Sequence, residues 1–281
     1  MSENDWDREV DVLVVGTGNG GRTAAVCNWE MGSKDVLIIE KQDKVGGTSA
    51  MSGGGIWIPN SHYAQEAGAD DSLDDAKRYL MNTLFGEDVP EDMIDTYLEK
   101  SPEMLKFLHD RTDVRYESLA EYPDYYTNME GARAGHRSLE PSPIMASELG
   151  DNWKNMTWTH FMMRMFNRIH FTQVEAHLLM VQLPGWKKLL GRLMWDYIRD
   201  IPWRLKTPIS RRLACGSAGV ARLYLSVLKR QIPIEFNTQM VELIADGDPP
   251  PTSGAPSYLW CPLSPLVPPP TSGAPSYHIG Y

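Results

Sequence analysis

The chain of 281 residues has few cysteines, no long apolar run and fewer cationic than anionic side chains. Its three cysteines, Cys27, Cys215 and Cys261, show neither the close spacing of a zinc site nor the even number of a disulfide framework, which favours a reducing compartment. No apolar run approaches the roughly 20 residues of a membrane-spanning helix. Residues 1–9 are acidic and polar, unlike a secretory or mitochondrial leader. We expect a cytoplasmic protein in which residues 1–9 are a disordered lead-in.

The net charge is −10, from 27 cationic and 37 anionic side chains. This balance argues against a general nucleic-acid binder, whose electrostatic footprint is basic. Histidines occur in a segment rich in methionine and tryptophan, but they lack the i, i+3 or i, i+4 spacing of a helical metal site. They are His160, His170 and His177. We therefore predict no nucleic-acid partner and no metal site.

The most informative stretch begins with an apolar run, Val12–Val15, which a glycine turn and a helix-compatible segment follow. This order of strand, turn and helix is that of a dinucleotide-binding βαβ unit, whose glycines permit a tight turn and a close approach to a pyrophosphate. The glycines are Gly16, Gly18, Gly20 and Gly21. A second apolar run, Val36–Ile39, ends at Glu40, whose carboxylate is placed to accept hydrogen bonds from a ribose diol. The pattern predicts nucleotide binding.

A second glycine-rich segment, residues 45–59, reads VGGTSAMSGGGIWIP. Such a backbone can lie flat against a ligand, although a flexible loop has the same composition. A GGTS-A-x-SGGG-IW-x-P segment after a Rossmann strand resembles the fumarate reductase/succinate dehydrogenase flavoprotein superfamily, and within it the 3-ketosteroid Δ1-dehydrogenases. The resemblance implies FAD as the cofactor. Further cofactor-binding residues expected here are Lys41, Gly46, Gly47, Thr48, Ser49, Ser52, Gly53 and Gly54.

Residues 114–143 are loop-like and carry four tyrosines beside Arg133, His136 and Arg137. A tyrosine-rich loop alone is typical of packing and surface. PDYY followed by EGxRxGxRxxxP also resembles the 3-ketosteroid Δ1-dehydrogenases, in which the first tyrosine of DYY lines the steroid pocket and supports the proton-abstracting base. That resemblance makes Tyr125 the candidate catalytic residue, as part of a hydrogen-bonded relay. We assign no role to His136.

Residues 61–212 are expected to form a helical and loop insertion that contributes to the substrate pocket. The acidic first part, 61–110, has apolar positions at helical spacing and reads as solvated helices. The last part, 185–212, carries eight cations against two anions, a net +6, interleaved with aromatic and aliphatic residues. Such a helix either packs on its own domain with its cations in solvent or lies on an anionic membrane. Peripheral membrane contact through 185–212 is therefore a hypothesis.

Residues 213–246 return to the superfamily pattern. Gly216, Gly219 and Leu223 resemble a GGxxLxxxL helix that packs against the nucleotide domain. A short strand is expected over Ile234–Phe236, and residues 239–244 read as the next strand. The resemblance implies that the backbone near Val241 holds the adenine.

After Gly247 the composition changes, because the ten-residue sequence PPPTSGAPSY occurs twice within residues 247–281. A proline-rich repeat of this kind cannot build a core and is expected to be extended or disordered. The resemblance implies a substrate domain at this point of the chain. We expect a truncated gene product whose tail comes from a frameshift or non-coding sequence. A genuine proline-rich ligand for SH3- or WW-type modules is the alternative.

The sequence thus predicts an α/β fold: a Rossmann-like FAD-binding domain over 10–246, with helical insertions and without its substrate domain. The resemblance implies 1,2-dehydrogenation of a 3-keto steroid or steroid-like triterpenoid, with an unidentified electron acceptor. Because the principal base and the carbonyl clamp of that family lie in the missing part, we expect the chain alone not to turn over. The alternatives are a fumarate reductase-type flavoprotein and a non-catalytic remnant with an interaction tail.

Overall fold

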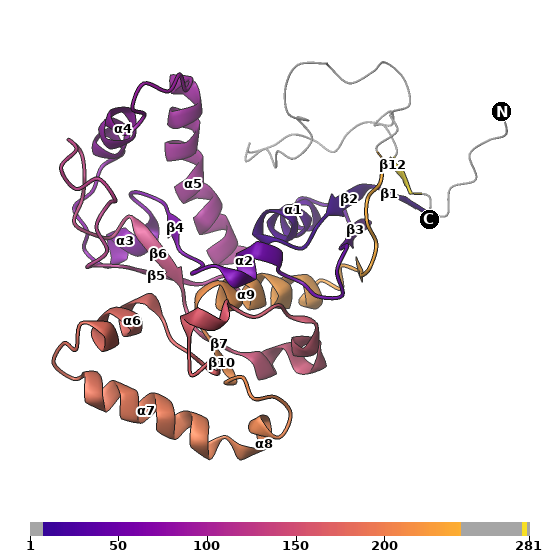
Figure 1. The fold of residues 1–281 in the computed structure, drawn as a ribbon. Helices are drawn as coiled ribbons and strands as arrows, with labels where there is room; N and C mark the ends of the chain where they lie inside the picture. The colour runs from indigo at the N-terminus through magenta and orange to yellow at the C-terminus, as the bar shows by residue number, and fades with distance from the viewer. Residues whose placement is uncertain (1–7, 243–276, 280–281) are drawn as a thin grey trace.

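A computed structural model describes residues 8–242 and 277–279 of the chain. It contains a parallel three-stranded sheet in the order β11-β3-β2, toward one end of the molecule (Figure 1). β2 (Val12–Val15) pairs along its whole length with β3 (Val36–Ile39), and β11 (Ile234–Glu235) pairs with the other edge of β3. All four residues of β3 are buried, as expected for the central strand of a parallel sheet.

The helix α1 (Asn19–Glu30) connects β2 to β3 and completes the predicted βαβ unit. The helix α9 (Cys215–Lys229) contacts both α1 and the short helix α2 (Gly47–Met51). Apolar side chains from the sheet, α1 and the α9 region form one buried cluster. Its members are Val14, Ala25, Val26, Val36, Ile38, Val227 and Ile232. The predicted packing of the Gly216–Leu223 helix against the nucleotide-binding unit is therefore confirmed.

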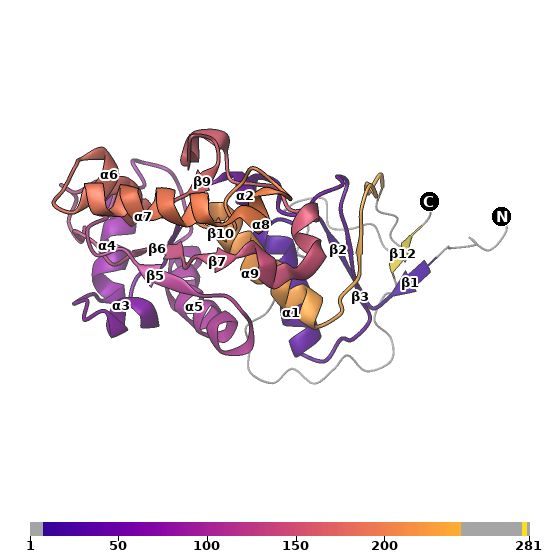
Figure 2. The same ribbon diagram turned by 90° about the horizontal axis from the view of Figure 1, so that it is seen from below.

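A second, antiparallel sheet has the order β4-β6-β5 and lies between two groups of helices (Figures 1 and 2). Its strands are β4 (Ile56–Trp57), β5 (Tyr116–Ser118) and β6 (Ser138–Pro141). One group of helices is α3 (His62–Glu66), α4 (Leu73–Asn82) and α5 (Glu91–Arg111). Ser72 caps α4 and Pro90 precedes α5, so the acidic segment is helical, as predicted.

The other group of helices comes from residues 144–213. It contains α6 (Gln173–Met180), α7 (Trp186–Arg199) and α8 (Ile201–Arg204), with two 3₁₀ segments, η1 (Ala146–Asn155) and η2 (Phe161–Met163). Two short strand pairs hold this part together. They are β7 (Ile144–Met145) with β10 (Arg212–Leu213), and β8 (Arg164–Met165) with β9 (Ile169–His170). In the described part of the chain, no helix is long and apolar enough to cross a bilayer.

The ends of the described chain differ in part from the expectation. β1 (Arg8–Val10) pairs with β12 (Tyr277–Ile279), so strand structure begins two residues before position 10 and includes three residues of the expected tail. Residues 1–7, 243–276 and 280–281, which include most of the proline-rich tail, lie outside the described residues. Residues 239–242 do not form the strand predicted there. All four of these residues are exposed, so even the apolar Met240 and Val241 are not packed against the sheet.

Candidate cofactor and substrate site

The glycine turn between β2 and α1 has the geometry that its sequence predicts. Gly16 has a φ of 91°, a conformation that favours glycine, and a Cβ there would meet no atom within 4 Å. A Cβ on Gly21 would lie 2.2 Å from the carbonyl oxygen of Gly16, so only glycine lets α1 approach the strand. Helix α1 begins after Gly18 with no side-chain cap and no acidic residue in its first turn. Its N-terminus therefore presents backbone N–H groups to an anion.

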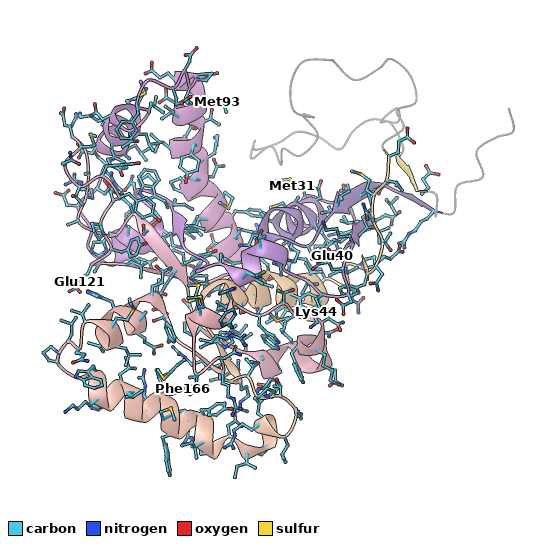
Figure 3. The ribbon with its side chains drawn as sticks, in the orientation of Figure 1. Met31, Glu40, Lys44, Met93, Glu121 and Phe166 are labelled. Atoms are coloured by element: carbon cyan, nitrogen blue, oxygen red, sulfur yellow. The ribbon has the colours of Figure 1, made fainter. Side chains whose placement is uncertain are left out.

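Glu40 directly follows β3 and is 8% exposed (Figure 3). Its Oε2 accepts hydrogen bonds from the amide of Thr17 at 2.9 Å and from the Thr17 hydroxyl. Its Oε1 accepts from the amide of Gln42 at 3.0 Å. The carboxylate is held in one orientation at the strand ends, where the carboxyl edge of a parallel sheet binds nucleotides.

Sequence reasoning missed Thr17, which is fully buried and connects the two glycine motifs. Its Oγ1 accepts a hydrogen bond from the amide of Gly46 at 3.1 Å while its hydroxyl donates to Glu40. The signal was present, since a hydroxyl residue between two turn glycines can bond the acidic residue at the neighbouring strand end. One side chain thus fixes the first turn, the acidic residue and the second glycine segment.

The second glycine segment packs against α1 and α9. The amide of Asn19 donates to Ser49 Oγ at 3.1 Å, which joins the N-terminus of α1 to α2. The amide of Gly54 donates to Ser52 Oγ, and a Cβ on Gly54 would lie 2.7 Å from the amide nitrogen of Gly216. Some glycines in this segment are therefore required for packing rather than for a ligand.

Other backbone positions around the turn face open space. A Cβ at Gly20 or Gly47 would meet no atom within 4 Å, as at Gly16. Open backbone, the N–H groups at the start of α1 and a buried carboxylate acceptor together fit a dinucleotide with its pyrophosphate at the turn and its ribose at Glu40. Lys41 and Thr48 are exposed beside this face, and no structural contact gives either a role.

Val241 is not held in place by the described structure. The chain leaving β11 runs beside the end of β3, where the amide of Thr238 donates to the Glu40 carbonyl at 2.9 Å. Val241 itself is 91% exposed and belongs to no strand. Its contact with an adenine remains a prediction.

A cavity of about 630 Å³ adjoins the glycine segment. One wall is residues 52–55, and much of the rest is aromatic. The aromatic lining is Trp57, Tyr79, Tyr122, Tyr125 and Tyr126. The structure thus brings Ser52, Gly53 and Gly54 to the same cavity as Tyr125, although Tyr125 is more than 70 residues away in sequence. An apolar, planar molecule would find matching walls here.

Tyr125 is 84% exposed, and a neighbouring phenol contacts it. Tyr122 is hydrogen-bonded to Tyr125, and this bond, with burial as the smaller cause, raises the pKa of Tyr122 above its ordinary value. The role of Tyr125 in a proton relay remains a prediction.

Buried ion pairs position the loop that carries Tyr125. Arg137 is 1% exposed and donates to both oxygens of Asp71 and, at 2.9 Å, to Asp124 Oδ2. The other oxygen of Asp124 accepts from the indole of Trp57 at 2.7 Å. Arg133 forms ion pairs with Asp71 and with Asp75 of α4. The arginines of the EGxRxGxR pattern therefore hold the pocket wall rather than contact a ligand.

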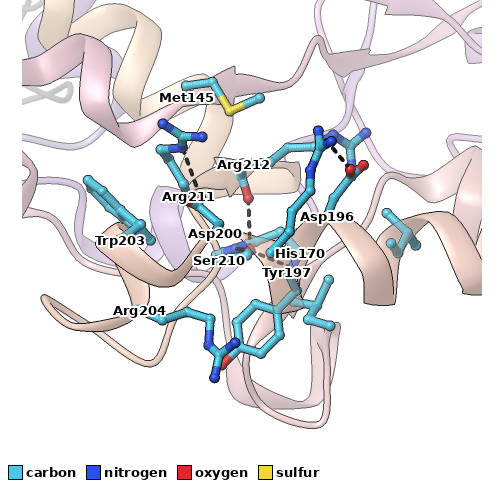
Figure 4. Close-up of a pocket in the computed structure, with 13 residues that line it drawn as sticks. Met145, His170, Asp196, Tyr197, Asp200, Trp203, Arg204, Ser210, Arg211 and Arg212 are labelled. Atoms are coloured by element: carbon cyan, nitrogen blue, oxygen red, sulfur yellow. Dashed lines mark hydrogen bonds and ion pairs between the residues drawn. The ribbon is translucent and has the colours of Figure 1, made fainter.

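A separate cavity of about 370 Å³ lies between α7, α8, β9 and β10 (Figure 4). Arg211 pairs with Asp200 at its edge. His170 is buried there, with Nδ1 3.1 Å from Ser210 Oγ, and burial lowers the pKa of His170 to about 3. No residue of either glycine motif lines this cavity. Among the described residues, no group of three or more histidine, cysteine, aspartate or glutamate side chains is arranged to hold a metal ion.

Comparison with known proteins decides which dinucleotide the first site binds. The profile of one family, the FAD binding domain, matches residues 11–255. The chain belongs to this family. Its cofactor is FAD, and the predicted Rossmann-like FAD-binding fold is confirmed.

The relatives of this FAD-binding chain include several 3-oxosteroid 1-dehydrogenases. That of Comamonas testosteroni is 34% identical over 247 residues, which cover 85% of this chain and 42% of the relative. The crystal structure of the 3-ketosteroid Δ1-dehydrogenase of Sterolibacterium denitrificans, in complex with 1,4-androstadiene-3,17-dione, has a TM-score of 0.80 and 37% identity, again over 85% of this chain and 42% of that one. A flavocytochrome c3 fumarate reductase shares the fold, at a TM-score of 0.51 and 15% identity over 86% of this chain and 29% of that one.

The chain thus spans about 42% of the length of the steroid dehydrogenases that it matches. The resemblance to 3-ketosteroid Δ1-dehydrogenases is confirmed, and the fumarate reductase alternative has the weaker support.

Proposed function

We propose that this chain is the FAD-binding part of an oxidoreductase that 1,2-dehydrogenates a 3-keto steroid or a steroid-like triterpenoid. The observation that carries the proposal is the position of the aromatic cavity. It shares residues 52–55 with the glycine segment that packs on α1, so a ligand in it would lie beside the bound cofactor. The similarity to 3-oxosteroid 1-dehydrogenases supports a steroid ketone as the ligand.

The chain's own residues have separable roles in this reaction. Glu40 and the N-terminus of α1 bind the cofactor, and Arg137 with Asp124 holds the wall of the cavity. Tyr125 lines the cavity with its phenol hydrogen-bonded to Tyr122, where it supports removal of a proton from the substrate. Bound FAD supplies the hydride acceptor.

Ligand binding tests the proposal without requiring turnover. The FAD-loaded chain is titrated with androst-4-ene-3,17-dione and, in parallel, with fumarate, and the flavin absorption spectrum is followed. The proposal predicts a saturable spectral change with the steroid and none with fumarate. A response to fumarate alone, or no response to any steroid ketone by a chain that holds FAD, would contradict it. Desaturation assays with an artificial electron acceptor then test turnover.

We also propose that the α7–α8 surface contacts an anionic membrane. Four large apolar side chains on it are between 49% and 84% exposed, namely Trp195, Ile198, Ile201 and Leu205. Lys187 and Lys188 on α7 add cations, whereas Arg192 and Arg199 are paired with carboxylates. The opposite face of α7 packs on its own domain through Leu189 and Leu193, as the alternative interpretation predicted.

Liposome sedimentation tests this second proposal. The chain should pellet with anionic vesicles at low salt, and a Trp195→Ser/Leu205→Ser variant should remain in the supernatant. Sedimentation that is equal for both proteins, or absent for the unmodified chain, would exclude this surface as the contact.

A further inference from the structure

Arg22 is a fully buried charge on the helix that follows the glycine turn. It is 0% exposed and lies on the same buried face of α1 as Ala25 and Val26. Arginine is almost never fully buried unless it is paired. A position facing the core of a nucleotide-binding helix ordinarily holds an apolar side chain, so this arginine needs a physical reason.

All the hydrogen-bond partners of its guanidinium are electrically neutral. Nη1 donates to the carbonyl of Val220 on α9 at 2.5 Å, and Nη2 donates to Asn19 Oδ1 at 3.2 Å. Nε lies 3.4 Å from the carbonyl of Gly18. Within residues 8–242, none of the ion pairs includes Arg22. The bonds satisfy the donors but leave the positive charge without a contacting anion.

Burial lowers the pKa of Arg22 to about 9, and the nearby Tyr224 and Glu40 act in the opposite direction. The side chain is therefore still protonated at neutral pH. Glu40 is the carboxylate that influences it, yet both oxygens of Glu40 accept hydrogen bonds from Thr17 and Gln42 instead. A buried charge that is only distantly compensated destabilises the protein unless another anion approaches it.

The partners of Arg22 identify that anion. Gly18 is the N-cap of α1 and Asn19 its first residue, so the guanidinium is bound to the turn at the helix N-terminus. This is where the phosphates of a dinucleotide bind in such a fold. The first turn of α1 contains no acidic residue that could neutralise the charge.

We propose that Arg22 is a positioning residue for the FAD pyrophosphate: it fixes the Gly18–Asn19 turn, and its buried charge is compensated by the bound dinucleotide. The inference rests on FAD binding and is independent of the substrate. It implies that the chain without cofactor carries an electrostatic penalty that cofactor binding removes.

Thermal melting and FAD titration of Arg22→Met and Arg22→Lys test the proposal. Met fills similar space without charge, so the cofactor-free variant should melt at the same temperature as the unmodified chain or higher, while saturating FAD should raise its melting temperature less. Its Kd for FAD should rise by at least about tenfold, which is the effect of losing about one charge-assisted interaction. Lys retains the charge, so its Kd should stay within a few-fold of the unmodified value.

A purely structural role gives a different pattern. Arg22→Met would then melt lower without cofactor, FAD would raise its melting temperature by the unmodified amount, and Lys would be as harmful as Met. That result would overturn the proposal. Arg222→Met is the matched control, because Arg222 also donates to backbone carbonyls, Ser142 O and Pro143 O, but lies outside the glycine turn. It should lower the melting temperature and leave the FAD-induced increase unchanged.

A measurement on the unmodified chain covers the case in which neither Arg22 variant folds. Millimolar inorganic pyrophosphate should raise the melting temperature of the cofactor-free chain, and adenosine at the same concentration should not match it. A chain that binds FAD but gains no stability from pyrophosphate would overturn the proposal.

Discussion

Thr17 and Glu40 form the contact that joins the two sequence motifs of the cofactor site. The amide and the hydroxyl of Thr17 both donate to Glu40 Oε2, and the same hydroxyl oxygen accepts from the Gly46 amide. The orientation of the acidic residue is therefore set from the first glycine turn. This arrangement gives the first testable prediction.

Thr17→Val keeps the shape of the side chain and removes its hydroxyl. Because Glu40 and the Gly46 amide both lose a buried partner, the free energy of unfolding should fall by about 1–3 kcal/mol and the Kd for FAD should rise by about tenfold. Urea unfolding and flavin fluorescence measure the two effects. The control is Thr207→Val, which removes a hydroxyl that accepts from Ile209 in the loop after α8. An unchanged Kd for Thr17→Val would contradict the role of Thr17.

Arg137→Met should destabilise the chain strongly. It leaves Asp71 and Asp124 buried without their cation, and breaking one partner of a buried pair costs about 3–5 kcal/mol. Arg133→Met is the matched control in the same network, because its side chain is 34% exposed, and it should cost about 1 kcal/mol or less. Urea unfolding of both variants measures the two losses in the free energy of unfolding. Equal losses would show that the network is not organised around Arg137.

Tyr125→Phe should change the titration of its neighbour. The hydrogen bond to Tyr125 is the largest cause of the raised pKa of Tyr122, so its loss should lower the pKa of Tyr122 toward the ordinary value near 10. Ultraviolet difference titration of the unmodified chain and of Tyr125→Phe, each compared with Tyr122→Phe, isolates this group. The folded stability should hardly change, because Tyr125 is mostly exposed. A pKa of Tyr122 that does not move would remove the evidence for the relay.

His170 should make the stability depend on pH. Burial lowers its pKa to about 3, whereas the unfolded chain takes up the proton near pH 6.5. The stability that neutral His170 gives to the folded state is therefore complete above pH 6.5. It is lost as the pH falls from 6.5 toward 3, by about 1.4 kcal/mol per pH unit. Unfolding of the unmodified chain and of His170→Gln between pH 7 and pH 5 should show a shallower slope for the variant. Identical slopes would show that His170 does not cause the pH dependence of the stability.

The sequence predicts the nucleotide-binding unit well because its determinants are local. Gly16 and Gly21 act through their own backbone geometry and that of the next turn, and Glu40 follows directly from the end of a buried strand. The DYY and EGxRxGxR patterns likewise located the tyrosine loop. Their resemblance to a family, rather than their composition, led to the prediction of a substrate pocket.

The remaining features depend on contacts between distant segments. Arg22 meets Val220, and Trp57 meets Asp124, across long stretches of chain that no local pattern brings together. The strand expected near Val241 likewise depended on pairing with a distant segment. Residues 239–242 pair with no strand, although β11 is an edge of the described sheet.

The absorption spectrum of the purified chain, after incubation with excess FAD and removal of the unbound cofactor, tests the central claim most directly. The claim is that the turn from Gly16 to Gly21, the Glu40 carboxylate and the second glycine segment bind FAD. We predict flavin bands at close to one flavin per chain. A chain that is folded by circular dichroism but remains colourless would contradict the claim.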